Sequence, residues 1–274
     1  MEAIVSGLFV YPIKGCRAIA VESAPVEARG LRNDRRWMLV HAETGGFLSQ
    51  RSHSEMARIH VTVTEGDTLG VVFGRELVVV PFVPDAELER ITATIWGFTG
   101  DALDCGEEAA SFFTDLLRLP LRLVRVPDDF ARRVSPRFAR TPTDGTGFAD
   151  GFPVLLTTEP SLSDLNTRLP VPVPMNRFRP NVVVSGDFAP WAEGGWETLR
   201  IGNVVLHHMK PCERCGVTTI EQETGAHTGA EPLATLATFR RDAVSGKVLF
   251  GANLTPEPCE ICPVIRVGDA LTVA

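Results

Sequence analysis

The string Pro211-Cys212-Glu213-Arg214-Cys215 combines residue types and a spacing that could do chemistry. A C-x-x-C spacing brings two sulfurs together on a turn. Thiolates are soft ligands that suit zinc, iron–sulfur clusters and copper, and by the same logic molybdenum. Arg214 beside Cys215 is expected to favour the thiolate over the thiol. The alternative is that one or both cysteines are buried as small apolar side chains.

A second C-x-x-C pair, Cys259 and Cys262, follows further along the chain. Two such pairs are typical of a four-sulfur zinc site, although the gap here exceeds the ~15–20 residues of a compact zinc ribbon. An accessory zinc or iron–sulfur site is therefore an open alternative, with Cys212, Cys259 and Cys262 as its ligands. Cys16 and Cys105 stand alone.

Basic residues stand where loops are expected to meet strands. Lys14 follows a strand that we predict at 5–11, Arg35 precedes a strand predicted at 37–41, and Arg179 lies in a loop before Asn181. Loops and strand ends are where ligand groups project, and Lys and Arg bind phosphate and carboxylate well. For any one of them alone, a surface salt bridge is the simpler interpretation.

Composition limits the classes of function. The chain has 274 residues, 44% of them hydrophobic, and a formal net charge of −7. That length can bury a sizeable core, and the negative charge with no Lys/Arg run argues against nucleic-acid binding. We find neither the ~18 consecutive apolar residues of a membrane span nor a signal peptide. We therefore expect a cytoplasmic protein with no membrane association and with mostly reduced cysteines.

The pattern of elements predicts an α+β, mainly β protein with a barrel-like part. β-branched and aromatic runs predict strands at 5–11, 37–41, 59–63, 69–73, 77–80, 153–156, 181–185, 204–208 and 265–273. Apolar spacing predicts short helices at 107–117, 160–169 and 232–240, the second capped by Thr158. The Pro-, Arg- and Gly-rich segment 127–150 is interpreted as an exposed loop and a domain boundary.

An ordered series of strings resembles a known family. The C-terminal half resembles a MOSC domain, the fold shared by molybdenum-cofactor sulfurases and amidoxime-reducing proteins. The strings are Phe178-Arg179-Pro180-Asn181, Pro211 to Cys215 with Thr218-Thr219-Ile220, Glu231 to Leu236, Phe250-Gly251 with Asn253, and Ile265 to Asp269. The N-terminal half resembles the β-barrel that precedes MOSC in amidoxime-reducing proteins, through Tyr11 to Lys14, Gly30-Leu31, Asp34-Arg35 with Trp37, Gln50-Arg51 and Asp104 to Glu107.

The resemblance implies a domain division and a cofactor. It implies a MOSC N-terminal β-barrel domain at 1–125 and a MOSC β-barrel domain at 126–274, with N-terminal strands that could contribute to both. It also implies a molybdenum cofactor, molybdopterin, bound between the halves, with Cys215 as metal ligand and catalytic residue. The cofactor-binding residues would then be Lys14, Gly15, Arg35, Arg179, Asn181, Glu213, Arg214 and Asn253.

Some positions depart from the family pattern. Gly15 stands where relatives often carry Ser, so a phosphate contact there would come from the backbone N–H alone. Glu213 replaces a small polar residue, and its charge would be unfavourable if it pointed inward. Gly151 and Phe152 stand where some relatives have Thr-Ser, and the Cys259/Cys262 pair is outside the pattern.

The resemblance implies an enzyme that reduces N-hydroxylated compounds by cleaving the N–O bond. The sequence includes no ferredoxin domain, so we expect an external electron donor such as a flavin reductase, a ferredoxin or a cytochrome b5-like protein. One alternative is a persulfide sulfur carrier or transferase of the MOSC type, acting through Cys215. The other is the four-Cys zinc module.

Overall fold

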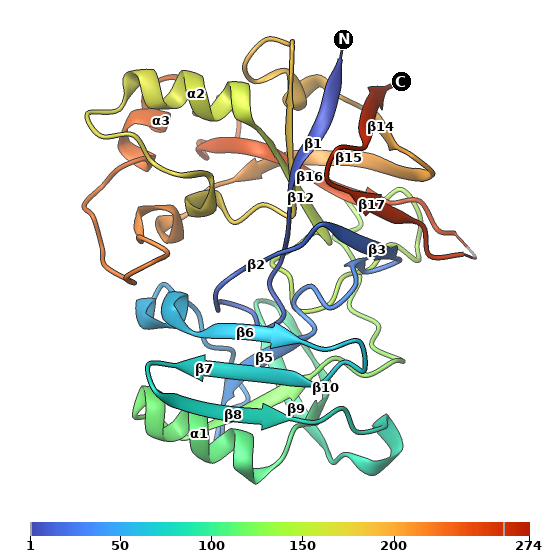
Figure 1. Ribbon diagram of the computed structural model, residues 1–274, viewed down its shortest axis with the longest axis vertical. Helices are drawn as coiled ribbons and strands as arrows, with labels where there is room; N and C mark the ends of the chain where they lie inside the picture. Colours follow the sequence, from blue (N-terminus) through green and yellow to red (C-terminus); the bar gives the residue numbers. More distant parts are fainter. Residues whose placement is uncertain (1, 260) are drawn as a thin grey trace.

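The computed structural model describes residues 2–259 and 261–274, which form two β-rich halves stacked along the long axis (Figure 1). The helices of these residues are α1 (Glu107–Leu117), α2 (Glu159–Arg168) and α3 (Leu233–Phe239). The strands are β1 (Ala3–Val10), β2 (Ile19–Ala20), β3 (Ser23–Glu27), β4 (Gly30–Leu31), β5 (Trp37–His41), β6 (His60–Val63), β7 (Leu69–Phe73), β8 (Glu76–Val80), β9 (Arg90–Ile95), β10 (Phe98–Asp104), β11 (Leu121–Arg125), β12 (Val154–Thr158), β13 (Val182–Gly186), β14 (Thr198–Ile201), β15 (Val204–Glu213), β16 (Leu249–Pro256), β17 (Val264–Arg266) and β18 (Ala270–Val273).

The half drawn at the top of Figure 1 is a closed barrel. Its strands follow the order β13-β12-β16-β15-β14-β18-β1, and β1 pairs back with β13 to close the ring. Inward side chains such as Val5, Val184 and Leu254 are fully buried and form one apolar core. Closure leaves these strands without a free edge, which fixes their register and gives a rigid frame. The first strand of the chain therefore belongs to the barrel that otherwise consists of strands after residue 150.

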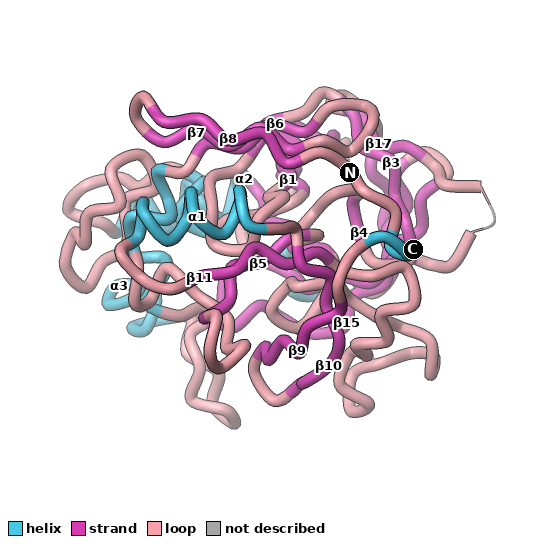
Figure 2. The backbone as a smooth tube through the Cα atoms, turned by 90° about the horizontal axis from the view of Figure 1, so that it is seen from below, coloured by secondary structure: helices cyan, strands magenta, loops and turns pink. Residues whose placement is uncertain are grey.

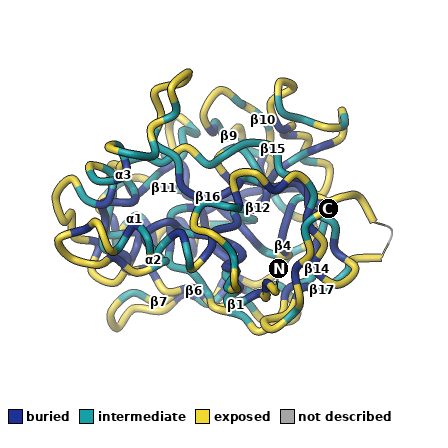
Figure 3. Tube along the Cα trace, turned by 90° about the horizontal axis from the view of Figure 1, so that it is seen from above, coloured by how far each residue is buried: buried dark blue, intermediate teal, exposed yellow. Residues whose placement is uncertain are grey.

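The other half packs α1 between two small sheets. One sheet has the order β5-β11-β10-β9 and the other β6-β7-β8, and α1 lies between β5–β11 and β6–β8 (Figure 2). Phe113 on α1 is fully buried against Leu39 of β5 and Val71 of β7 in one apolar cluster. Exposed residues gather in the peripheral turns, while the central strands are mostly buried (Figure 3). No helix of the described ranges has the length and apolarity needed to cross a bilayer.

The predicted fold class is confirmed, and several elements have the predicted bounds. β5 and α1 begin and end at the predicted residues, and the Thr158 hydroxyl caps α2 by accepting from the Ser161 N–H at 3.3 Å. The last strand was predicted as continuous, but it is split into β17 and β18. The break falls at Gly268, whose φ of +91° favours glycine. The division of the chain near residue 125 stays a prediction.

The interpretation of 127–150 as an exposed loop is wrong for part of that segment. Arg132, Asp144 and Phe148 are buried. The guanidinium of Arg132 donates to the carbonyls of Gly147 and Asp150 at 2.9 and 2.6 Å. A buried cation with carbonyl acceptors thus folds the segment into a fixed shape, which the sequence pattern did not reveal.

A turn at 221–226 joins the two halves. The carboxamides of Gln50 and Gln222 exchange hydrogen bonds of 3.1 and 3.0 Å, and Gly225 lies against the backbone of Ser54. A Cβ on Gly225 would meet the Ser54 carbonyl oxygen at 2.8 Å, and the φ of Gly225 is +73°. The close approach therefore requires glycine at this position.

We predict that Gly225→Ala destabilises the protein more than Gly229→Ala. Gly229 also has a positive φ, +90°, but a Cβ there meets nothing within 4 Å. The left-handed backbone alone costs about 1 kcal/mol, and the clash with Ser54 adds about 2 kcal/mol. Chemical denaturation of both variants measures the difference, and equal losses of stability would contradict the proposed contact.

Candidate active site

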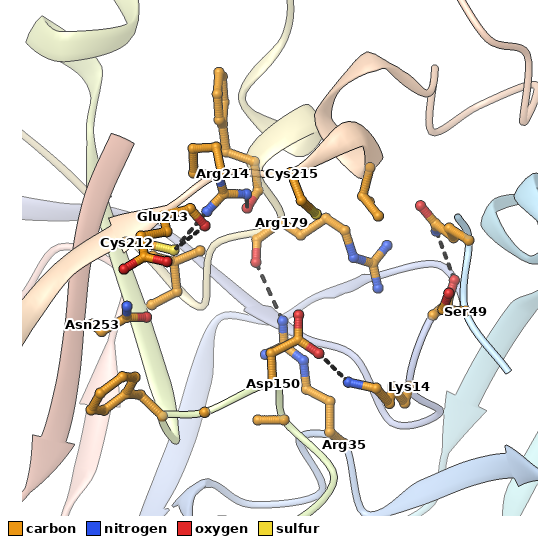
Figure 4. Close-up of a pocket in the computed structure, with 18 of the residues that line it drawn as sticks. Lys14, Arg35, Ser49, Asp150, Arg179, Cys212, Glu213, Arg214, Cys215 and Asn253 are labelled. Carbon is orange, nitrogen blue, oxygen red and sulfur yellow. Dashed lines mark hydrogen bonds and ion pairs between the residues drawn. The ribbon is translucent and has the colours of Figure 1, made fainter. Parts of the chain in front are cut away.

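A cleft of about 400 Å³ lies between the halves (Figure 4). The predicted cofactor-binding and metal-ligand residues all line it: Lys14, Gly15, Arg35, Arg179, Asn181, Glu213, Arg214, Cys215 and Asn253, with Cys212 beside them. The two sides come from separate parts of the chain, the segments near 14, 35 and 50 on one side and those near 179, 214 and 253 on the other. The fold thus brings together residues that are up to about 240 positions apart in sequence.

Lys14 is held deep in the cleft by the backbone around it. Its N–H donates to the Trp37 carbonyl at 2.8 Å, and the Trp37 N–H donates to the Pro12 carbonyl at 3.0 Å. These bonds fix the Tyr-Pro-Ile-Lys segment along the start of β5. Only 7% of Lys14 is exposed, and burial lowers the pKa of its ammonium group, although the neighbouring carboxylate of Asp150 opposes this.

Asp150 is the counter-ion of Lys14, and a dashed line joins the two in Figure 4. Its side chain is 65% exposed at the mouth of the cleft. Desolvation by the cleft walls acts to raise the pKa of Asp150, but the nearby cations, Lys14 above all, hold it below its usual range. The Trp96 indole Nε1 also donates to Asp150, at 3.2 Å. Asp150 therefore stays ionised at neutral pH.

Arg35 and Arg179 both lie over the ring of Tyr11. Their guanidinium carbons are 4.2 and 4.4 Å from the ring centroid. Burial raises the pKa of Tyr11 to about 12, so its hydroxyl stays protonated and donates to the Pro180 carbonyl at 3.0 Å. Burial also lowers the pKa of the Arg179 guanidinium. Cation–π contacts with the Tyr11 ring partly offset the desolvation of the two cations.

Asn181 holds Arg35 in place. Its carboxamide oxygen accepts from Arg35 at 2.9 Å and from the Leu155 N–H at 3.1 Å, and its amide donates to the Phe9 carbonyl at 3.1 Å. Asn181 is almost fully buried and lies two residues after Arg179, the left-handed residue that caps the short helix Met175–Phe178. Its side-chain oxygen is thus used within the protein, so it acts on the cleft through Arg35.

The structure differs from the expectation that Arg214 accompanies Cys215. The Arg214 guanidinium contacts Cys212 Sγ at 3.0 Å and the Phe178 carbonyl at 2.7 Å. The guanidinium that contacts Cys215 belongs to Arg51, whose Nη2 lies 3.2 Å from the Cys215 Sγ. Neighbours in sequence point apart here because β15 ends at Glu213, and Cys215 begins the short helix Gly216–Thr219.

Glu213 points its charge at a neighbouring cation. Its Oε1 accepts from Lys210 Nζ at 2.6 Å, and the residue is exposed at the rim. This pairing removes the unfavourable inward charge considered from the sequence. Asn253 on β16, in register with Lys210 on β15, lies on the same side of the cleft (Figure 4).

The cleft is strongly cationic, although the chain as a whole has a net charge of −7. Among the described lining residues, the cations are Lys14, Arg35, Arg51, Arg179, Lys210 and Arg214, and the carboxylates are Asp150 and Glu213. Carboxylates pair with Lys14, Arg35 and Lys210. Within residues 2–259 and 261–274, Arg51, Arg179 and Arg214 form no such pair, and Arg214 Nε is buried without an acceptor. Uncompensated cations around a sulfur fit an anionic ligand that carries a soft metal.

Two of these arginines and Trp96 adopt left-handed backbone conformations. Their φ angles are 47° for Arg35, 54° for Arg179 and 54° for Trp96. Non-glycine residues pay about 1–3 kcal/mol for such strain, and they persist where the surrounding structure fixes them at functional sites. The surrounding contacts thus hold three such residues in the lining of this cleft.

Comparisons with known proteins match both halves of the chain. A model of the MOSC N-terminal β-barrel domain matches residues 2–120, and a model of the MOSC domain matches residues 144–272. Mitochondrial amidoxime-reducing component 1 of Mus musculus is 33% identical over 283 residues, covering 97% of this chain and 80% of the mouse protein. The human component 1 is 33% identical over 258 residues, covering 91% of this chain and 75% of the human protein.

This chain belongs to the MOSC family, in its amidoxime-reducing-component-like branch. The resemblance predicted from the sequence strings is thereby confirmed. Mitochondrial amidoxime-reducing component 2 of Bos taurus is a further relative, 32% identical over 256 residues and covering 91% of this chain and 76% of the bovine protein. All three relatives are named amidoxime-reducing components.

The second C-x-x-C pair of this MOSC chain lies away from the cleft. β15 and β16 are antiparallel, with Leu206 opposite Pro256 and Glu213 opposite Leu249. Cys212 and Cys215 therefore lie at one end of the pair and Cys259 beyond the other, roughly 20 Å away. No group of three or more potential metal ligands occurs in the described ranges, and the structure does not bring the two cysteine pairs of the alternative four-sulfur site together. Cys259 and Cys262 are exposed, and Glu260 between them lies outside the described residues.

Some lining residues of the MOSC cleft had no role assigned from the sequence. Arg51 belongs to a family string, but nothing in the sequence connects it with Cys215. Trp96 and Asp150 lie in a hairpin turn and in the segment interpreted as an exposed loop. A left-handed φ at a tryptophan and a buried Lys with one counter-ion become visible only in three dimensions.

We predict that Asp150→Asn destabilises this MOSC protein by about 1 kcal/mol at pH 7, since the carboxylate is largely exposed but its loss leaves Lys14 buried without a partner. The pKa of Asp150 is lower in the folded than in the unfolded chain. Its contribution is therefore present above its ordinary pKa of 3.8 and is lost as pH falls through the folded value.

Denaturation at pH 7 and at pH 2 measures this difference between the variant and the wild type, because the pKa of Asp150 in the folded chain lies well below 3.8. Asp101→Asn is the matched control, because Asp101 is also exposed and lies 3.9 Å from Arg90. A penalty that is the same at both pH values, or equal in the control, would contradict the Lys14–Asp150 assignment.

Proposed function

We propose that this chain binds molybdopterin in the cleft, with Cys215 as the molybdenum ligand, and reduces N-hydroxylated compounds with electrons from an external donor. The observation that carries the proposal is the position of Cys215 Sγ. It lies in a cleft whose arginines exceed its carboxylates, 3.2 Å from the guanidinium of Arg51. Relatives named amidoxime-reducing components support the same reaction class.

The residues present fit this cofactor. A thiolate at Cys215 suits a soft metal, and Lys14, Arg35 and Arg179 would hold the phosphate and pterin with charge-assisted hydrogen bonds. The Gly15 backbone, Arg214 and Asn253 would supply further contacts, since they line the same cleft. Asn181 would act by fixing Arg35, and Glu213 by fixing Lys210.

When bound, the molybdenum centre supplies the two-electron chemistry that removes the oxygen of an N–OH group. The net reaction converts an amidoxime, two electrons and two protons into an amidine and water. The chain itself would orient the ligand through the buried ammonium group of Lys14 and the fixed guanidinium groups of the cleft. Because Asp150 remains ionised, it accepts hydrogen bonds at the mouth of the cleft and is not the proton donor at neutral pH.

The electrons would come from a separate protein or reductase. A flavin reductase with a ferredoxin or a cytochrome b5-like carrier fits this role, and a chemical reductant replaces it in a test. We also propose that the protein is cytoplasmic, as its composition predicts.

We predict that Cys215→Ala abolishes reduction of benzamidoxime, because the metal loses its protein ligand. Protein produced in a host that synthesises molybdopterin is reduced with a reduced viologen, and formation of benzamidine is measured. Cys262→Ala is the matched control and keeps the wild-type rate, since Cys262 is exposed far from the cleft. Equal activities of Cys215→Ala and the wild type, or no activity in either, would contradict the proposal.

Mass spectrometry of the same protein separates the enzyme from the persulfide carrier. A bound pterin with an unmodified Cys215 supports the enzyme. A persulfide on Cys215 without bound pterin supports the sulfur carrier or transferase of the MOSC type.

We also predict that Arg179→Lys lowers retention of the cofactor by about tenfold. Lysine keeps the charge but loses the planar fork that donates to Cys16 and Gln222 and faces the cleft. Molybdenum and pterin content after gel filtration measure the retention. Arg200→Lys, an exposed change on β14, is the control, and equal losses in both variants would contradict the role of Arg179.

A further inference from the structure

Trp96 occupies a backbone position that suits other residues. It is the first residue of the two-residue turn between β9 and β10, where Ile95 pairs with Phe98. Its φ is 54°, which Gly, Asn and Asp adopt far more readily than an aromatic residue. The apolar core of this sheet includes Ile95 and Phe98 but, among the described residues, not Trp96. Trp96 thus lies outside the apolar core of its own sheet.

The indole is nevertheless held from several sides. The Arg51 guanidinium carbon lies 4.6 Å from its centroid, and the Phe47 ring meets it edge-on at 4.8 Å. Its Nε1 donates to Asp150 at 3.2 Å. The side chain is thus fixed in one orientation, although the residue is 44% exposed and lines the cleft.

Arg51 connects this aromatic surface to the sulfur. The same guanidinium that stacks on Trp96 lies 3.2 Å from Cys215 Sγ. The indole and the guanidinium over it therefore form a surface of the cleft lining that reaches from Trp96 to the proposed metal ligand. The ionised carboxylate of Asp150 lies at the edge of this surface and accepts hydrogen bonds.

We infer that Trp96, with Arg51 stacked on it, selects planar aromatic N-hydroxylated substrates, an inference that rests on the proposed function. A substrate whose N–OH group approaches the Cys215 end must place the rest of its structure beside this surface. An aryl ring packs well against flat indole and guanidinium groups. The amino group of an amidoxime can donate to Asp150. Small substrates without a ring gain no stacking contact.

The test compares benzamidoxime with hydroxylamine in the viologen-driven assay of the cofactor-loaded protein. Trp96→Asn suits the left-handed backbone and so preserves the turn. We compare kcat/KM for benzamidoxime with kcat/KM for hydroxylamine. Trp96→Asn is expected to lower the ratio of the two about fivefold to tenfold, mainly because KM for benzamidoxime rises. Trp96→Phe restores the ratio to within about twofold of wild type, because it keeps an aromatic ring.

The matched control is Phe82→Ala. Phe82 is also a half-exposed aromatic residue with guanidinium groups stacked on it, from Arg36 and Arg125, but it does not line the cleft. This variant leaves the ratio unchanged. An unchanged ratio in Trp96→Asn, or an equal fall for both substrates, would overturn the inference while the proposed function stands.

Binding gives a readout that does not depend on turnover. Isothermal calorimetry of the loaded protein with benzamidine, the reaction product, should show about fivefold weaker binding in Trp96→Asn than in the wild type or Phe82→Ala. If the wild type reduces neither substrate, the proposed function fails, and this measurement still decides the aromatic surface. Equal benzamidine affinities in wild type and Trp96→Asn would refute it.

Discussion

Positive charges held side by side where the two halves meet determine much of this structure. Arg35 and Arg179 share the Tyr11 ring, and Lys14 is buried nearby. Like charges in a partly dry site repel one another, and removing them from water costs several kcal/mol each unless partners compensate. Asp34 compensates Arg35, but Arg179 has no carboxylate partner within the described ranges. The cleft is therefore prepared for an anion.

Rigid elements maintain this arrangement. The barrel has no open edge along its ring and holds Asn181 at the start of β13, while the packed α1 half holds Lys14 against β5. The reciprocal carboxamide bonds of Gln50 and Gln222 connect the two halves beside the cleft. Because these charges are already held in place, binding a ligand does not require the side chains to be ordered, and the free-energy cost of binding is lower.

The sequence predicted the residues of the site more completely than it predicted the strands of the fold. Cys215 and Lys14 were predictable because their residue types, in order, match family strings. β16 was missed because Gly251 and Asn253 are poor strand formers, and only its pairing with β12 and β15 makes it a strand. The contact of Arg51 with Cys215 and the strained φ of Trp96 depend on tertiary structure, so no local pattern could predict them.

X-ray absorption at the molybdenum edge tests the central claim most directly, using protein from a host that synthesises molybdopterin. The account predicts about one molybdenum per chain, with one sulfur ligand fewer in Cys215→Ala than in wild type or Cys262→Ala. Protein that contains no molybdenum, or a sulfur shell unchanged by Cys215→Ala, would contradict it.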